Sequence, residues 1–355
     1  MSRFLEERYQ KLTPYTPGEQ PKVKDLIKLN TNESPYPPGP KTLAAVTDPD
    51  LAAGLRRYND PEAGRLRDLL AARYGVSREN VYVSNGSDDI LNFSFQAFGG
   101  DGVLFPAISY GFYQVFADLH QRDYVKVPLR ADLTIDPRDY MDKGRLVVLA
   151  NPNAPTGRTL SLPEIEEILR HNEDHVVLID EAYVDFGGAS SVPLTKEYPN
   201  LLVTMTFSKS RSLAGARLGF AIGDRGLIQD LERLKYATNP YNVNSLTQAA
   251  GAAALAEEDY YQANCRRIMK TRERTAAALK EMGFQVVPSQ ANFLFVRTDR
   301  MAGGDLYQAL RDRKILVRHF DQEEIRDYNR ITIGTDQEMD ALIQAVGEIL
   351  AGKEA

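Results

Sequence analysis

The sequence is poor in the residues that cross-link small folds or bind metals. It has one cysteine, Cys265, four histidines and no tryptophan among 355 residues. A single cysteine cannot form an intrachain disulfide, which is typical of proteins from a reducing compartment. His171 and His175 have the i, i+4 spacing of a helical metal-binding pair, but the polar residues between them indicate a turn. We therefore expect no metal site and a cytoplasmic location.

The sequence also lacks long apolar runs and basic blocks. No uninterrupted apolar stretch approaches the roughly 18 residues of a membrane span, and residues 1–8 have no apolar core of a signal peptide. A net charge of −6 without a basic cluster argues against a nucleic-acid partner. A small phosphorylated ligand is still compatible, because one pocket needs only a few cations. The remaining class is a globular protein of ordinary composition.

Short apolar runs alternate with helix-like segments through the middle of the chain. Nearly continuous apolar strands separated by helices are typical of parallel sheets that are buried on both faces. The sequence therefore predicts an α/β fold with a mainly parallel central sheet flanked by helices. The expected strands cover residues 81–84, 101–106, 145–150, 175–180, 201–205 and 218–222.

The pattern changes near residue 245, where a long Ala-, Arg- and Lys-rich helical stretch begins. A strand at 292–296 and a helix at 306–313 follow, which predicts a smaller α+β domain. The start of the chain is rich in Pro, Tyr and Asn and predicts an extended arm that packs with the small domain. The expected division is arm, large domain and small domain at residues 1–40, 41–245 and 246–355.

Lys209 lies directly after an expected strand, within Thr206-Phe207-Ser208-Lys209. Sites in open α/β sheets form at the carboxyl ends of strands, although a solvated loop lysine is the alternative. A segment of small residues then leads to Arg217. Small residues let the backbone approach a ligand, and the planar guanidinium group suits phosphate.

Three further strand ends carry polar residues. Asp180 ends the fourth expected strand, where a buried carboxylate needs a cationic partner unless it caps a helix. Gly86-Ser87-Asp88 leads from a strand into a helix, and the N–H groups there can bind an anion, although such residues also cap helices. Residues 151–157, Asn-Pro-Asn-Ala-Pro-Thr-Gly, form a turn that offers an amide side chain.

Taken in order, these segments resemble the fold-type I aminotransferases, which use pyridoxal 5′-phosphate (PLP), and the likeness covers nearly the whole chain. Within that superfamily the closest likeness is to the histidinol-phosphate aminotransferases. The supporting segments are Leu12-Thr13-Pro14-Tyr15, Leu29-Asn30-Thr31-Asn32-Glu33, Arg57-Tyr58-Asn59-Asp60-Pro61, Pro106 to Gly111, Tyr241-Asn242-Val243-Asn244 and Arg330 to Thr335.

The resemblance implies roles for individual residues. Lys209 would bind PLP and then move the substrate proton, Asp180 would pair with the ring nitrogen, and Tyr183 would bond the ring oxygen. Asparagine usually stands directly before Pro-Thr-Gly in the family, but this sequence has Ala154 there. We expect either Asn153 to take over or Tyr183 to act with water. The cofactor set implied is Gly86, Ser87, Asp88, Tyr110, Asn153, Asp180, Tyr183, Thr206, Ser208, Lys209, Arg217 and Tyr58.

The family's dimers share active sites, so Tyr58 would reach the cofactor phosphate of the neighbouring subunit. The resemblance implies transamination of L-histidinol phosphate with 2-oxoglutarate, giving imidazole-acetol phosphate and L-glutamate. An aromatic amino acid aminotransferase and a PLP decarboxylase of a phosphorylated amino acid are the alternatives. The substrate-binding residues implied are Tyr15, Asn32, Tyr241, Arg318 and Arg330.

Overall fold

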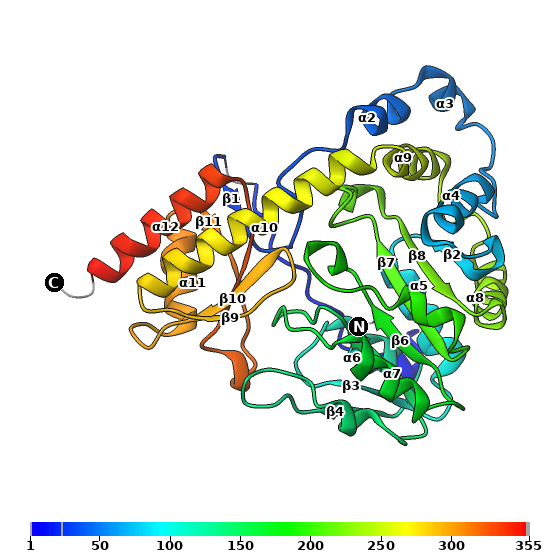
Figure 1. Cartoon of the computed structure of the whole chain (residues 1–355), viewed down its shortest axis with the longest axis horizontal. Coiled ribbons are helices and arrows are strands. Elements are labelled where there is room, and N and C mark those ends of the chain that lie inside the picture. Colours follow the sequence, from blue (N-terminus) through cyan, green and yellow to red (C-terminus); the bar gives the residue numbers. More distant parts are fainter. Residues whose placement is uncertain (1, 23, 353–355) are drawn as a thin grey trace.

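The computed structural model describes residues 2–22 and 24–352. Residues 1, 23 and 353–355, which belong to the expected arm and small domain, lie outside the described part. Figure 1 shows a large lobe built on the central sheet and a smaller lobe that contains the C-terminal helix α12 (Asp336–Ala351). The long helix α10 (Glu258–Glu281) runs from one lobe to the other.

The central sheet has seven strands in the order β2-β8-β7-β6-β5-β3-β4. Only β8 runs antiparallel to its neighbours, so the expected mainly parallel sheet is confirmed. Strand β4 was not expected, because exposed Val125 and Lys126 interrupt its apolar pattern at the sheet edge. The strands are β2 (Val81–Ser84), β3 (Val103–Pro106), β4 (Tyr124–Val127), β5 (Leu146–Ala150), β6 (Val177–Asp180), β7 (Leu201–Thr206) and β8 (Gly219–Gly223).

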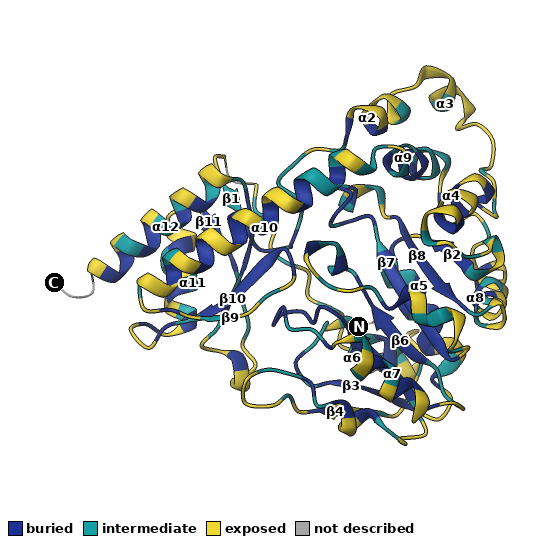
Figure 2. Cartoon of the chain, in the orientation of Figure 1, coloured by how far each residue is buried: buried dark blue, intermediate teal, exposed yellow. Residues whose placement is uncertain are grey.

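Helices cover both faces of this sheet, so its strands are almost entirely buried except for the edge strand β4 (Figure 2). Alternate residues of β5 point to opposite faces: Val147 and Leu149 belong to one apolar cluster, and Leu146 and Val148 to the other. The helices of the large lobe are α2 (Pro40–Val46), α3 (Pro49–Gly54), α4 (Gly64–Tyr74), α5 (Ser87–Phe98), α6 (Phe112–Leu119), α7 (Leu162–Arg170), α8 (Arg225–Thr238) and α9 (Ser245–Leu255).

The small lobe contains an antiparallel sheet in the order β12-β13-β10-β9. Apolar residues of this sheet and of helices α10, α11 and α12 share one core cluster. The N-terminal arm joins this lobe through β1, which pairs in parallel with β11. The elements are β1 (Ile27–Lys28), β9 (Gln285–Val287), β10 (Phe293–Arg297), β11 (Ile315–Leu316), β12 (Arg318–His319), β13 (Asn329–Thr332), α1 (Glu7–Gln10) and α11 (Gly303–Asp312).

The helical stretch expected from residue 245 is two helices, α9 and α10. Helix α9 contacts α2 and α4, and Ala250 and Ala254 belong to the core of the large lobe. The expected division at residues 40 and 245 stays a prediction. Short 3₁₀ helices complete the described chain at Arg78–Asn80, Pro137–Tyr140, Val184–Phe186, Val192–Lys196, Ala214–Ala216 and Glu323–Ile325. None of the helices in residues 2–22 and 24–352 is long and apolar enough to cross a membrane.

Candidate active site

The site is built on the carboxyl ends of three neighbouring strands. Strand β6 lies between β5 and β7, and the register sets Asp180 beside Ala150 on one side and Thr204 on the other. Lys209 follows the end of β7 by three residues. Because parallel strands end at the same edge of a sheet, the acid and the lysine meet in one cavity.

This cavity has a volume of about 460 Å³. Most of the expected cofactor-binding residues line it: Ser87, Asp88, Tyr110, Asp180, Tyr183, Thr206, Ser208, Lys209 and Arg217. Ala214 and Gly215, from the segment of small residues expected to approach a ligand, also line it. The sequence analysis assigned no binding role to the remaining lining residues: Gln20, Thr31, Glu33, Ala150, Ala154 and Ala182.

Asp180 is a buried acid that requires a positive partner. Burial raises its pKa to about 6, although the Tyr113 hydroxyl and the Ala182 N–H donate hydrogen bonds that oppose this rise. These bonds measure 2.9 Å to Oδ2 and 3.2 Å to Oδ1. A cation placed against the carboxylate would lower its pKa and restore the ionised form. Sequence reasoning missed Tyr113, because a tyrosine inside a helix gives no sign of which group it will bond.

Lys209 is a partly buried amine whose pKa is lowered. Burial, together with the nearby Arg330 guanidinium, lowers its pKa to about 8. Its Nζ donates a hydrogen bond to the Thr31 carbonyl oxygen at 3.0 Å and lies 5.8 Å from the centre of the Tyr183 ring. A lysine with such a pKa is substantially neutral in mildly alkaline solution, so it can act as a nucleophile or a base.

An anion-binding corner lies at the start of helix α5. Gly86 precedes the helix with φ of +87°, and a Cβ there would stand 2.8 Å from an Arg217 nitrogen. Arg217 donates to the Asp88 carboxylate at 2.8 Å. The Thr206 hydroxyl donates to Ser208 Oγ at 2.9 Å. A helix N-terminus with an arginine and two hydroxyls suits a phosphate group.

The small lobe contributes two arginines on adjacent strands. Arg318 on β12 lies directly opposite Arg330 on β13. Arg330 is partly buried, and this desolvation lowers its pKa. It donates to the Asn30 carbonyl oxygen at 2.8 Å. Its Nε is buried without a hydrogen-bond partner among the described residues. Such an unsatisfied charged donor favours an anionic ligand.

Aromatic residues of the arm and of the segment around the start of α6 lie near the anion-binding corner at the start of α5. The Tyr110 hydroxyl donates to Asp88 Oδ1 at 2.9 Å. Tyr15 stacks on Phe112 at 4.2 Å and meets Tyr110 edge-on at 6.0 Å. Burial raises the pKa of Tyr15, and the charges of Arg318 and Arg330 oppose this rise. The structure therefore brings Tyr15 and both arginines together.

Asn32 contacts the site through Tyr183. Its Nδ2 donates to the Tyr183 hydroxyl oxygen at 2.9 Å. Asn32 has φ of +56°, in the left-handed region that asparagine tolerates better than most residues. This backbone geometry turns its amide side chain toward Tyr183.

Eight expected residues do not line this cavity: Gly86, Tyr15, Asn32, Arg318 and Arg330, which lie near it, and Asn153, Tyr58 and Tyr241. Asn153 is buried and donates to the Ile108 carbonyl at 3.1 Å and to Thr156 Oγ1 at 3.0 Å, while its Oδ1 has no partner in the described chain. Tyr58 and Tyr241 stack on each other at 4.5 Å. Tyr58 is 82% exposed, so its ring faces outward rather than into the site.

The chain belongs to the aminotransferase class I and II family, whose model matches residues 24–346. Its relatives narrow this class further: it belongs with the histidinol-phosphate aminotransferases. It is 49% identical over 348 residues to the histidinol-phosphate aminotransferase of Chromohalobacter salexigens, covering 98% of this chain and 99% of that one. It is 46% identical over 353 residues to that of Brachyspira hyodysenteriae, covering 99% of each chain.

A solved structure agrees in fold. The histidinol-phosphate aminotransferase of Sinorhizobium meliloti, in complex with pyridoxal-5′-phosphate, superimposes with a TM-score of 0.84 at 26% identity. The match covers 92% of this chain and 91% of that one. The expected α/β aminotransferase fold is thereby confirmed.

Proposed function

We propose that this chain transfers the amino group of L-histidinol phosphate to 2-oxoglutarate with PLP as cofactor, giving imidazole-acetol phosphate and L-glutamate. Full-length relatives at 46–49% identity support this activity. The observation that carries it is a pair of anion-binding arginines near Lys209, of which Arg217 lines the cavity. Lys209 lies within the electrostatic reach of both Arg217 and Arg330, so one arginine can bind the cofactor and the other the substrate.

The residues present fit PLP at both of its polar ends. The buried Asp180 carboxylate requires a cation, which a protonated pyridine nitrogen supplies. The start of α5 with Arg217, Thr206 and Ser208 suits the phosphate. When bound, PLP provides the electron sink that makes breaking a bond at the substrate Cα feasible. We assign Gly86, Ser87, Asp88 and Tyr110 to the same binding set.

Lys209 is the group that we expect to remove and return the substrate proton. A base must be neutral to accept a proton, and burial has already lowered the pKa of Lys209 to about 8. Tyr183 is held by Asn32, so its hydroxyl has a fixed position for a hydrogen bond to the ring oxygen. We also propose Asn153 as a donor to the ring oxygen. Its amide nitrogen already donates to Ile108 and Thr156, so these hydrogen bonds would have to change first.

Arg330 and Arg318 are proposed to bind the anionic end of either substrate. A guanidinium group can pair with phosphate or with carboxylate, so the same residues accept histidinol phosphate and then 2-oxoglutarate. Tyr15 borders this pair and can contact the substrate. Tyr241 belongs to the proposed substrate set only in combination with a second subunit, because it lies with Tyr58 outside the cavity.

We propose that the chain acts as a homodimer in the cytoplasm, with Tyr58 reaching the PLP phosphate of the partner. Its high exposure supports this role. The single cysteine fits the location. The measured mass in solution should be twice 39.7 kDa, and Tyr58→Phe should weaken PLP binding. A monomer with full activity would contradict the shared site. The three-part division at residues 40 and 245 is part of the same proposal.

The activity is tested by measuring glutamate formation with 2-oxoglutarate and either L-histidinol phosphate or L-phenylalanine. We expect a much higher kcat/KM with histidinol phosphate, because only its phosphate ester offers a dianion to Arg330. Preference for phenylalanine would point to an aromatic aminotransferase. Release of CO₂ without any need for an oxoacid would point to a decarboxylase.

A further inference from the structure

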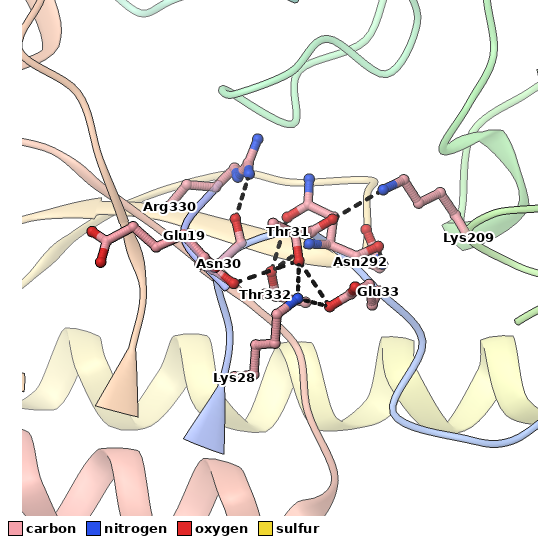
Figure 3. Close-up of polar contacts among 10 residues, drawn as sticks. Glu19, Lys28, Asn30, Thr31, Glu33, Lys209, Asn292, Arg330 and Thr332 are labelled. Atoms are coloured by element: carbon pink, nitrogen blue, oxygen red, sulfur yellow. Dashed lines mark hydrogen bonds and ion pairs between the residues drawn. The ribbon is translucent and has the colours of Figure 1, made fainter. Parts of the chain in front are cut away.

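Three consecutive residues of the arm, Asn30 to Asn32, each bond a different functional side chain. Figure 3 shows the first two contacts, to Arg330 and to Lys209. Two of these contacts use backbone carbonyl oxygens, which no side-chain pattern reveals. The contacts join Arg330 to the Asn30 carbonyl at 2.8 Å, Lys209 Nζ to the Thr31 carbonyl at 3.0 Å, and Asn32 Nδ2 to the Tyr183 hydroxyl at 2.9 Å. The position of this tripeptide therefore affects the positions of Arg330, Lys209 and Tyr183 together.

One side of the tripeptide is anchored on the small lobe. The Asn32 N–H donates to Thr332 Oγ1 at 2.9 Å, and Asn292 Nδ2 donates to the Asn32 carbonyl at 3.0 Å. Leu29 is tied to β13 through its carbonyl, which accepts from the Thr332 N–H at 2.9 Å. These bonds fix residues 29 and 32, and the Asn32 N–H bond also orients the planar peptide that carries the Thr31 carbonyl. They leave the Thr31 side chain to be fixed from the other side.

A ring of three side chains closes the other side, and we call it the Lys28–Thr31–Glu33 staple. Lys28 Nζ donates to Thr31 Oγ1 at 2.6 Å and to the Glu33 carboxylate (Figure 3). Thr31 Oγ1 donates to Glu33 Oε2 at 2.8 Å. Burial alone would raise the pKa of Glu33, but the bonds from Lys28 and Thr31 keep it below its usual range. The carboxylate is thus ionised at neutral pH.

The staple also places charge beside the lysine. Glu33 lines the cavity, and its carboxylate favours the protonated form of Lys209. Lys28 offsets this effect by pairing with Glu33. The charged groups that face Lys209 come from the arm, the small lobe and the edge of the central sheet: Glu33, Arg330, Asp88, Asp180 and Arg217.

We propose that the Lys28–Thr31–Glu33 staple is a positioning device for Lys209, an inference that rests on the proposed function. It holds the Thr31 carbonyl against the free amine and balances the charge that the amine meets. Lys28 and Glu33 are positioning residues, because they act through Lys209 and Thr31 rather than on the reacting atoms.

The two halves of the ion pair should have opposite effects on Lys209. Lys28→Met leaves the Glu33 charge unbalanced, so the pKa of Lys209 should rise from its value of about 8. Glu33→Gln removes the charge that favours the protonated amine, so the pKa of Lys209 should fall. Both changes remove the Lys28–Glu33 ion pair and so weaken the ring. A purely structural role would therefore move the pKa in the same direction or not at all.

The test measures the pKa of Lys209 in the full chain without PLP. The rate of acetylation by acetic anhydride is followed against pH, and the peptide that contains Lys209 is quantified by mass spectrometry. Lys28→Arg, which keeps the charge, should restore the wild-type pKa. Thr31→Val, which opens the ring without removing charge, should leave the pKa close to wild type. Arg274→Gln removes an exposed ion pair with Asp340 that includes no residue of the staple, and it serves as the matched control.

Activity of the PLP-loaded variants gives a second readout. Loss of a partly exposed pair should lower kcat/KM about two- to fivefold for Lys28→Met and Glu33→Gln, whereas Arg274→Gln should have no effect. Shifts of the Lys209 pKa in the same direction, or none, would overturn the proposal. If Lys28→Met fails to fold, Glu33→Gln alone tests the proposal: a lower Lys209 pKa than in the wild type supports it, and an unchanged or higher pKa overturns it. The acetylation readout needs neither substrate nor PLP, so it can fail while the proposed transamination stands.

Discussion

Replacing Asp180 by asparagine should have opposite effects on the protein with and without PLP. The carboxylate is buried, and within residues 2–22 and 24–352 its hydrogen-bond donors are the Tyr113 hydroxyl and the Ala182 N–H. Without a cation beside it, its negative charge destabilises the folded state, as its raised pKa indicates. Asparagine keeps the shape and an acceptor oxygen for the Ala182 N–H but carries no charge.

The sign and size of the stability change follow from the pKa of Asp180. The folded value of about 6 lies above the ordinary 3.8, so the folded chain binds this proton more tightly than the unfolded chain. The stability of the PLP-free protein must then fall as the pH rises from about 4 to about 6, and it stays reduced above that range. The rise from 3.8 to about 6, at about 1.4 kcal/mol per pKa unit, corresponds to roughly 3 kcal/mol. The Asp180→Asn variant should not lose this stability as the pH rises.

The assay is calorimetric unfolding of the PLP-free wild type and variant at several pH values. We expect similar stability near pH 4 and a more stable variant at pH 8, by up to roughly 3 kcal/mol. With PLP the order should reverse: loss of one partner of a buried charge pair costs about 3 kcal/mol or more, so PLP binding should weaken roughly 100-fold or more. A variant less stable than the PLP-free wild type at both pH values would refute the reasoning.

Three further changes test other parts of the site. Lys209→Ala should abolish the visible absorbance of bound PLP and lower kcat by at least about 10³-fold, as a spectrum and a steady-state assay would show; a retained band would contradict its role. Arg330→Lys should raise KM for both substrates about 10-fold or more, whereas an unchanged KM would remove it from substrate binding. Gly86→Ala should weaken PLP binding in a fluorescence titration, because its Cβ would stand 2.8 Å from Arg217 and φ is +87°; wild-type affinity would show that the corner is not the phosphate site.

Much of the fold could be predicted because fully buried strands leave a plain apolar signal. The runs ending at Ala150 and Asp180 are strands β5 and β6, within a few residues of the expected bounds. Strand β4 was not predicted, because an edge strand needs only one buried face and Lys126 interrupts its apolar run. The antiparallel direction of β8 could not be predicted, because residue type does not record which way a buried strand runs.

The site was predictable where a side chain at a strand end carries the chemistry, as for Lys209 and Asp180. It was not predictable where the contact comes from the backbone or from a distant segment. The Thr31 carbonyl that bonds Lys209 lies 178 residues away along the chain. The Tyr113 hydroxyl that bonds Asp180 belongs to a helix that has no polar motif of its own.

The central claim is that Lys209 carries PLP in a site for histidinol phosphate. The most direct measurement is the absorbance spectrum of the PLP-loaded protein before and after adding L-histidinol phosphate without any oxoacid, with L-phenylalanine in a parallel cuvette. The account predicts a visible band that is lost rapidly with histidinol phosphate alone, as pyridoxamine phosphate forms. Conversion only by phenylalanine would contradict the substrate, and the absence of any band with PLP present would contradict the role of Lys209.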